Sequence, residues 1–189
     1  MIFDRLKTST ALQHRRLEQI VGILEPGLDV TSYGVLLVGF HAFYAMIEPK
    51  IFEREEWKSL EFETKQRRKL ALLSSDLAAL DLPLPPPCPQ PTRLETFSQV
   101  LGAMYVLEGA TLGGQMIGRH LQHHLGLRVE NGAAFFGSYG ERVGPMWLEF
   151  RAFLSAQAFN DHIENDMVFG ALETFERFGN WLERETMPS

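Results

Sequence analysis

Hydrophobic residues recur along most of this chain at three- and four-residue steps, and no run alternates cleanly with a period of two. Such spacing places apolar side chains on one face of an α-helix, so the pattern predicts an all-α fold. The predicted helices span about residues 3–24, 31–47, 64–80, 92–124, 141–156 and 160–184.

Proline and glycine residues delimit these helices. The first should end at Glu25-Pro26-Gly27, and Pro49, which has no N–H to donate, should kink or end the second. The spacing of Thr92 and Glu95 predicts a capping box at the start of the fourth and longest helix. Gly126 is expected to cap the end of that helix, with a loop after it.

A proline-rich segment interrupts the helical pattern at about residues 82–91. Its composition predicts an extended connector with polyproline character. The segment is too short, and too closely bracketed by helices, to mark a domain boundary. Residues 1–189 are therefore expected to fold as one helical domain, for which the length is sufficient.

Composition narrows the range of functions. The net charge of -6 argues against nucleic acid as a partner, because phosphate binding needs a positive surface. The one cysteine, Cys88, excludes an internal disulfide and fits a reducing compartment. There is no uninterrupted apolar stretch of about 18 residues, so neither export nor a membrane span is indicated. A cytoplasmic location is expected.

Three glycines lie within the longest predicted helix: Gly109, Gly113 and Gly114. Each glycine in a helix interior costs about 1 kcal/mol relative to alanine, so something should compensate for them. A flat, bulky ligand that touches the helix backbone would be obstructed by a Cβ atom and would explain their presence. The alternatives are close helix–helix packing or a kink.

The second feature lies in the first predicted helix. Apolar residues at helical steps, Leu6 and Leu17 among them, place His14 in the buried stripe of an amphipathic helix. Glu18, four residues on, can reach an imidazole nitrogen on the same face. A histidine that gives one N–H to a carboxylate and leaves its other nitrogen free is arranged like an axial metal ligand. The alternative is a core histidine satisfied by a glutamate.

Together, the two stretches resemble the heme oxygenase family. That family carries Leu-Lys-x-x-Thr-x-x-x-His near its start, a pattern present here at residues 6–14. It also carries a glycine-bent distal helix, which residues 105–115 match, and their Tyr-Val-Leu-Glu-Gly run looks like the bacterial, biliverdin-producing branch. The resemblance extends from about Leu6 to Trp181.

The resemblance implies a helical bundle with heme between the N-terminal helix and the distal helix. His14 would be the axial ligand of the heme iron, and Glu18 would hold its other nitrogen. The backbone at Gly109, Gly113 and Gly114 would approach the opposite heme face and tilt bound O2 towards a meso carbon. The implied reaction opens heme b to biliverdin, releases Fe²⁺ and CO, and uses O2 and an external reductant such as a ferredoxin or a flavin reductase.

Proton delivery is where the sequence departs from the mammalian members of the family. An aspartate follows the first distal glycine in that branch, whereas Ala110 stands here. Thr111 and Glu108 are the candidates to hold waters for a proton relay, and Asn165 and Arg142 are weaker ones. Glu108 is equally well interpreted as the partner of a basic side chain on a neighbouring helix.

Cations and aromatic rings complete the implied heme site. The resemblance assigns Lys7 and Arg151 to the heme propionates, although both could be ordinary surface charges. Trp147 stands where some relatives have a lysine. Phe169 and Phe175 are candidate ring-packing residues, and their helical spacing is equally typical of a core.

Three functional hypotheses follow. The first is a cytoplasmic heme oxygenase of the bacterial type, which supplies biliverdin to a receiver such as a phytochrome. The second is a heme-binding carrier or sensor of the same fold that does not degrade heme, a hypothesis that Ala110 keeps open. The third is a helical enzyme of similar fold acting on a thiamine-pathway compound, which would need a cysteine or an acidic pocket rather than His14. No nucleic-acid or membrane partner is expected.

Overall fold

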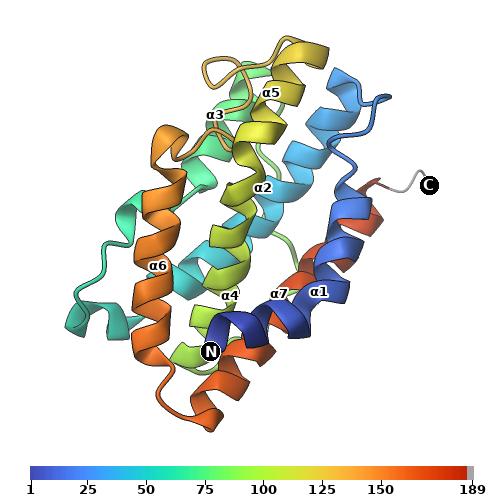
Figure 1. Ribbon diagram of the computed structural model, residues 1–189. Helices are drawn as coiled ribbons and strands as arrows, with labels where there is room; N and C mark the ends of the chain where they lie inside the picture. The colour runs from blue at the N-terminus through green and yellow to red at the C-terminus, as the bar shows by residue number, and fades with distance from the viewer. Residues whose placement is uncertain (187–189) are drawn as a thin grey trace.

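The computed structural model describes residues 1–186, and the regular secondary structure in that range is entirely helical. Helices α4 and α5 follow one another through the middle of the molecule (Figure 1). In the same view α1 and α7 lie on one side, α6 lies on the other, and α2 and α3 lie behind. The all-α prediction is confirmed. The α-helices are α1 (Ile2–Val21), α2 (Val30–Phe52), α3 (Leu70–Ala79), α4 (Phe97–Ala110), α5 (Gly114–Leu125), α6 (Val143–Gln157) and α7 (Asp161–Thr186), and the 3-10 helices are η1 (Glu55–Ser59), η2 (Lys65–Arg67), η3 (Thr111–Gly113) and η4 (Gly140–Arg142).

Local chemistry explains where the first two helices begin and end. α1 stops where Gly22 adopts a left-handed φ of 52°, a conformation that glycine reaches without strain. α2 starts after Asp29, whose carboxylate accepts the Ser32 N–H at 2.7 Å. α2 does not end at Pro49 but continues to Phe52. Because Pro49 lies in the last turn, its missing N–H removes a hydrogen bond only near the end of the helix.

The predicted capping box at Thr92 and Glu95 is wrong. α4 begins one residue after Thr96, whose Oγ1 accepts the Gln99 N–H at 3.2 Å while Gln99 Oε1 accepts the Thr96 N–H at 3.4 Å. Thr92 is instead buried in the connector, where its carbonyl accepts the Lys50 ammonium at 2.9 Å. Both threonines precede an acidic or amide residue by three positions, so spacing alone does not choose between them.

α3 also begins later than the predicted start at residue 64. The buried carboxylate of Glu48 accepts the backbone N–H groups of Lys69 and Leu70, and this interaction fixes the first turn of α3 at Leu70. The preceding residues form η2 and carry Arg67 into the protein interior.

α7 is the helix against which α1 and α4 both pack. Two glycines bring the α4 and α7 backbones together. A Cβ atom on Gly102 would lie 1.9 Å from the Met167 carbonyl oxygen, and one on Gly170 would lie 2.0 Å from the Gln99 carbonyl oxygen. These distances are far inside van der Waals contact, so glycine is required at both positions.

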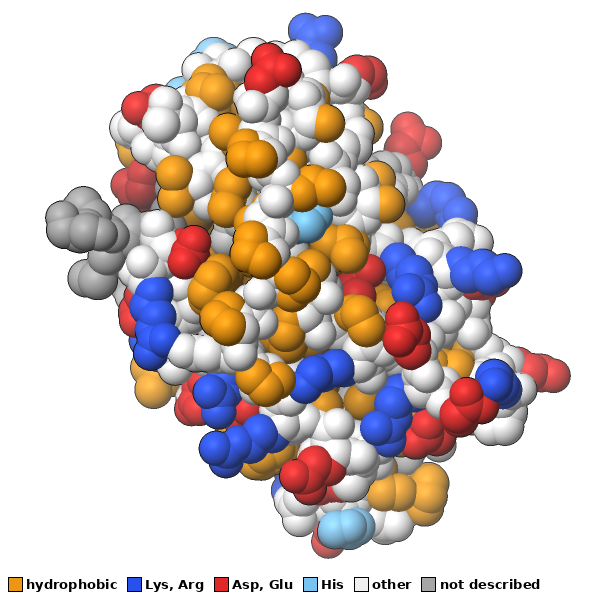
Figure 2. Space-filling model, turned by 180° about the vertical axis from the view of Figure 1, so that it is seen from behind, with side chains coloured by type: hydrophobic (Ala, Val, Ile, Leu, Met, Phe, Trp, Pro, Cys, Tyr) orange, Lys and Arg blue, Asp and Glu red, His pale blue; other side chains and the backbone are white. Residues whose placement is uncertain are grey.

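α2 supplies much of the hydrophobic core. It is long and apolar enough to cross a membrane by composition, but 61% of its most apolar window is buried inside the protein, so its composition is that of a core helix. Figure 2 shows hydrophobic side chains gathered on the face opposite to that of Figure 1. Exposed apolar residues on α2 and on the connector include Val35 and Leu84.

Candidate functional site

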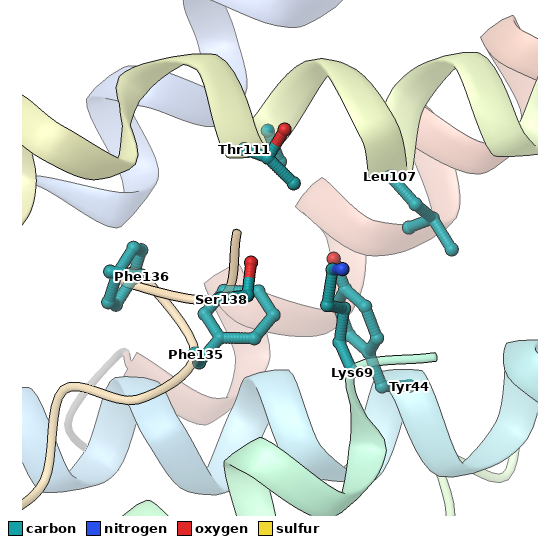
Figure 3. Close-up of a pocket in the computed structure, with 8 residues that line it drawn as sticks. Tyr44, Lys69, Leu107, Thr111, Phe135, Phe136 and Ser138 are labelled. Carbon is teal, nitrogen blue, oxygen red and sulfur yellow. The ribbon is translucent and has the colours of Figure 1, made fainter. Parts of the chain in front are cut away.

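The long glycine-containing helix is divided at its glycines. α4 ends at Ala110, η3 makes one tighter turn, and α5 begins at Gly114. The interruption agrees with the glycine-bent helix that the resemblance implied, and we refer to it as the bend; Figure 3 shows Thr111 there, on the side facing Lys69 and Tyr44. A change from α to 3-10 geometry alters the direction in which successive backbone groups point.

The three glycines of this bend have different surroundings. A Cβ atom on Gly109 would meet nothing within 4 Å, and one on Gly113 would meet only the Ile117 side chain at 3.5 Å. One on Gly114 would lie 2.1 Å from the Phe136 carbonyl oxygen. Packing against the loop before α6 thus explains Gly114 by itself. Packing does not explain Gly109 and Gly113, whose backbone borders open space.

His14 lies on an exposed face of α1. Its Nδ1 is 3.3 Å from Glu18 Oε2, as the spacing of the two residues predicted. The His14 side chain is 56% exposed, so the prediction that it lies in a buried stripe is wrong, although Leu17 and Val21 further along α1 do pack against the core. Within residues 1–186, no hydrogen bond reaches His14 Nε2. Nε2 is therefore free to bind a ligand. If a ligand covered it without bonding to it, the buried nitrogen would lack a partner, which is unfavourable.

Aromatic rings join α1, α4 and α6 near the N-terminus. The ring centroids of Phe3 and Tyr105 are 6.0 Å apart, those of Phe3 and Trp147 are 5.8 Å apart, and those of Tyr105 and Trp147 are 6.1 Å apart. These contacts hold the three helices together at this end.

Beyond this cluster, residues of α1 and of the glycine-containing helix can be matched by their levels along the two helices. Tyr105 interacts with the side chain of Thr10 on α1. His14 is one helical turn beyond Thr10, and Gly109 is one turn beyond Tyr105, so the two lie at a similar level on their helices. We use the name His14 cleft for the region that this alignment of α1 and α4 places between His14, Gly109 and Gly113. The His14 imidazole is 56% exposed, and a Cβ atom on Gly109 would meet nothing within 4 Å, so both residues are accessible to a ligand.

Two cations lie near the aromatic cluster. The Arg151 guanidinium is 4.9 Å from the centroid of the Phe3 ring, and Lys7 is exposed one turn after Phe3 on α1. Neither side chain forms an ion pair within the described residues. Both charges are thus available to a carboxylate ligand near the aromatic cluster.

The two candidate phenylalanines of α7 are placed differently. Phe175 is buried, and its ring lies edge-on to His14 with centroids 5.8 Å apart. Phe169 is 44% exposed and forms no ring contact with His14. The structure brings Phe175, rather than Phe169, to the imidazole.

Glu108 is engaged in a buried polar network. Its Oε2 accepts the Arg67 guanidinium at 2.6 Å, and its Oε1 accepts the Tyr139 hydroxyl at 2.8 Å. Arg67 is almost fully buried and also lies over the Phe62 ring, 4.4 Å from its centroid. Burial raises the pKa of Glu108, and the Arg67 charge opposes that shift. These contacts correspond to the structural interpretation of Glu108, as the partner of a basic side chain.

A small cavity lies against the bend on the side of α2 and α3. It has a volume of about 10 Å³, room for roughly one water molecule. Figure 3 shows the polar ends of Lys69 and Tyr44 together, pointing towards α4 and η3. Ser138 and Ala110 also line the cavity. Lys69 is buried, and desolvation lowers its pKa to about 8.

The other relay candidates are engaged elsewhere or only locally. The Thr111 hydroxyl donates to the Glu108 carbonyl at 2.6 Å, and its oxygen is still free to accept. Asn165 accepts from Arg5, and Arg142 donates to the Gln66 side chain at 3.0 Å.

Sequence reasoning missed Arg67, Lys69 and Tyr139. The basic cluster from Lys65 to Lys69 is typical of a solvated helix face, and nothing in its spacing shows that two of its members turn inwards. The signal that could have found Arg67 is Glu108, an acidic residue within an apolar helix that needs a cationic partner.

The fold and these residues define a class of protein: a helical bundle with an exposed histidine on its first helix and a long helix interrupted at glycines. The family model described as heme oxygenase matches residues 91–184. Heme oxygenase PigA of Pseudomonas aeruginosa is 26% identical over 182 residues, which cover 96% of this chain and 91% of that protein. A heme oxygenase of Xanthomonas campestris pv. campestris is 26% identical over 166 residues, covering 85% and 94% of the two chains.

Solved structures agree on the fold. The heme oxygenase of Neisseria meningitidis superposes with a TM-score of 0.86 at 22% identity, covering 98% of this chain and 92% of that one. The heme oxygenase of Leptospira interrogans superposes with a TM-score of 0.79 at 17% identity, covering 97% and 98%. The chain belongs to the heme oxygenase family. Membership supports an enzymatic role over that of a non-catalytic heme carrier.

Proposed function

We propose that this protein cleaves heme oxidatively to biliverdin and releases Fe²⁺ and CO. The observation that carries the proposal is the pairing of a free His14 Nε2 with open backbone at Gly109 and Gly113. Heme is the substrate, and its iron supplies the activation of O2 when heme is bound. An external reductant, such as a ferredoxin or a flavin reductase, supplies the electrons.

The residues of the cleft would then act as follows. His14 holds the heme iron through Nε2, while Glu18 keeps Nδ1 as the hydrogen-bonded nitrogen and fixes the ring orientation. Phe175 supports the imidazole edge-on. The backbone at Gly109 would leave room for a flat macrocycle that a larger side chain there would obstruct, and it would hold the ligand close to main-chain groups.

Lys7 and Arg151 would hold the two propionates. Their charges are unpaired, and a carboxylate is the partner that such cations prefer. Trp147 packs against Phe3 and Tyr105 in the aromatic cluster, where it fills space with a ring instead of adding a third cation.

Protons would reach the cleft by way of the cavity beside Ala110. This cavity is lined by Lys69, Tyr44 and Ser138 and lies against the bend. Its volume suits one water molecule. With its pKa at about 8, Lys69 is mostly protonated at neutral pH and can donate. In this arrangement Glu108 orders Tyr139 and Arg67 around the bend and does not itself carry the proton.

We further propose that the reaction takes place in the cytoplasm and that biliverdin passes to a receiver such as a phytochrome. The single cysteine fits a reducing compartment, and Cys88 is buried.

The experiment is a single aerobic assay. Purified protein is mixed with hemin, its visible spectrum is recorded, and ascorbate or a ferredoxin system is added in air. A Soret band that decays into a broad red biliverdin band supports the proposal. A stable Soret band would instead identify a carrier or sensor, and no heme band at all would exclude both heme functions.

A further inference from the structure

A second concave site lies on α5. It is a groove of about 450 Å³ between α5 and the segment that follows it, residues 128–143. Gly109 and Gly113, which border the His14 cleft, do not line it. Its volume falls within the range of about 300–1,000 Å³ that is typical of small-molecule sites. We refer to it as the α5 groove.

The edge of the α5 groove carries two unpaired cations. Arg119 and Arg128 both line it, and within the described residues neither guanidinium has an ion pair or a hydrogen-bond partner. Glu130 is the one acidic residue among the lining residues. The whole chain has a net charge of -6, whereas the charged residues that line the groove have a net positive charge. Two guanidinium groups favour a ligand with carboxylates.

The floor of the groove is partly apolar, with Gln115 and Gln122 also among the lining residues. A Cβ atom on Gly118 would meet nothing within 4 Å, so the α5 surface is open there. Val129 is 53% exposed, and Ala133 and Phe136 continue the apolar lining. A planar apolar molecule can lie on such a floor while its carboxylates reach the arginines.

We propose that the α5 groove is a second binding site for a tetrapyrrole carboxylate. The inference rests on the proposed function, because that reaction brings two molecules of this class to the protein: the linear product biliverdin, and heme in excess of the His14 cleft. Both combine an apolar tetrapyrrole with two carboxylates, which is the chemistry that the groove presents.

The test fills the cleft first and then measures binding at the groove. Protein loaded with one equivalent of ferric heme, without reductant, is titrated with biliverdin, and a parallel arm is titrated with a second equivalent of hemin. Absorbance and induced circular dichroism report binding. We expect one further equivalent to bind, and the double variant Arg119→Gln/Arg128→Gln to weaken that binding by about tenfold or more, which corresponds to about 1.4 kcal/mol.

Two further variants make the result specific. Gly118→Leu should fill the groove and abolish the second equivalent, and it should fold because its side chain enters open space and favours helix. The double variant Arg93→Gln/Arg184→Gln removes the same charge from exposed positions elsewhere and should bind as the wild type does.

Each outcome decides the proposal. If the groove variants lose binding of biliverdin but not of the second hemin, the ligand of the groove is the product. If they lose binding of the second hemin but not of biliverdin, the ligand is the substrate. Absence of a second equivalent in both arms, or binding that the groove variants leave unchanged, overturns the proposal. Aerobic turnover of hemin by the wild type tests the proposed function separately. If the protein binds no heme, biliverdin is titrated directly, and the same variants decide whether it lies in the groove.

Discussion

His14 and Glu18 show that residue type and spacing alone do not identify a metal-binding histidine. A histidine four residues before a glutamate is common on helix surfaces. What separates this pair from a surface ion pair is the surroundings: Nδ1 is occupied by Glu18, Nε2 is free, and Phe175 fixes the ring from the side. The functional claim for His14 therefore depends on two contacts and one free nitrogen rather than on its residue type.

Removal of Glu18 should weaken heme binding without abolishing it. We expect Glu18→Ala to lower hemin affinity by about 10- to 100-fold, because hydrogen-bond partners of metal-binding histidines contribute about that much. A Soret titration measures the affinity. Glu176→Ala, an exposed position on α7, is the matched control and should have no effect. Equal affinities for the Glu18 variant and the wild type would remove Glu18 from the site.

Arg67 should matter for stability in a pH-dependent way. Burial raises the pKa of Glu108, so the folded protein keeps a proton there to higher pH than the unfolded chain does, and this group stabilises less as the pH rises. Without Arg67 that pKa rises further. We expect Arg67→Leu to lower the free energy of unfolding by about 3–5 kcal/mol at pH 7.5, and by less at pH 5.

Urea unfolding at the two pH values measures both free energies. Arg93→Leu, a surface arginine, provides the control and should show no deficit at either pH. A deficit for Arg67→Leu that is the same at pH 5 and pH 7.5 would mean that the Glu108 charge is not what Arg67 compensates.

At the scale of elements, the glycines from α4 to α5 are of two kinds: some are required by backbone packing, and others are not. Gly102 and Gly114 are glycines because neighbouring backbone occupies the space of a Cβ atom, whereas Gly109 faces open space. Glycine at Gly109 therefore costs helix stability without a return in packing. Its benefit would come from the ligand.

Alanine substitutions should therefore have opposite effects on stability. Gly109→Ala should stabilise the heme-free protein by up to about 1 kcal/mol, because alanine favours helix, while weakening heme binding. Gly102→Ala should destabilise it, by about 1–3 kcal/mol or more, because its Cβ atom would lie 1.9 Å from the Met167 carbonyl. Denaturant unfolding and hemin titration measure the two properties. A destabilised Gly109→Ala protein would show that this glycine serves the fold.

Some elements could be predicted from the sequence better than others. Hydrophobic spacing was sufficient to predict most of the helices, whereas the glycines alone left a kink as one of several alternatives and the resemblance to a glycine-bent helix was needed to choose it. Where the choice depended on tertiary contacts, spacing was insufficient: the Lys50 ammonium holds Thr92 in the connector, so Thr96 caps α4. The exposure of His14 is a result of the same kind, because it depends on which helices pack against α1 and not on the spacing within α1.

At the scale of the whole molecule, the arrangement of helices creates both concave sites. α7 packs against α1 and α4, which leaves the His14 side of α1 exposed. α5 then continues past the bend, and the segment before α6 folds back on it at Gly114 and borders the α5 groove. Neither site follows from one helix alone, which is why the sequence indicated residues of the first and nothing of the second.

Heme binding should stabilise the whole fold. A ligand that binds only the native state adds about 2.7 kcal/mol to the free energy of unfolding at 100 times its dissociation constant. We expect ferric heme to raise the melting temperature of the wild type, and to raise that of His14→Ala much less at the same concentration. An identical rise in both proteins would place the main heme contact outside the His14 cleft.

The most direct measurement of the central claim is chemical rescue of a cavity at His14. His14→Gly removes the imidazole, and hemin turnover to biliverdin is then assayed with and without added imidazole. We expect the variant to be inactive alone and to recover activity as imidazole binds in place of the side chain. Full activity of His14→Gly without imidazole would contradict the account, because the iron ligand would then lie elsewhere.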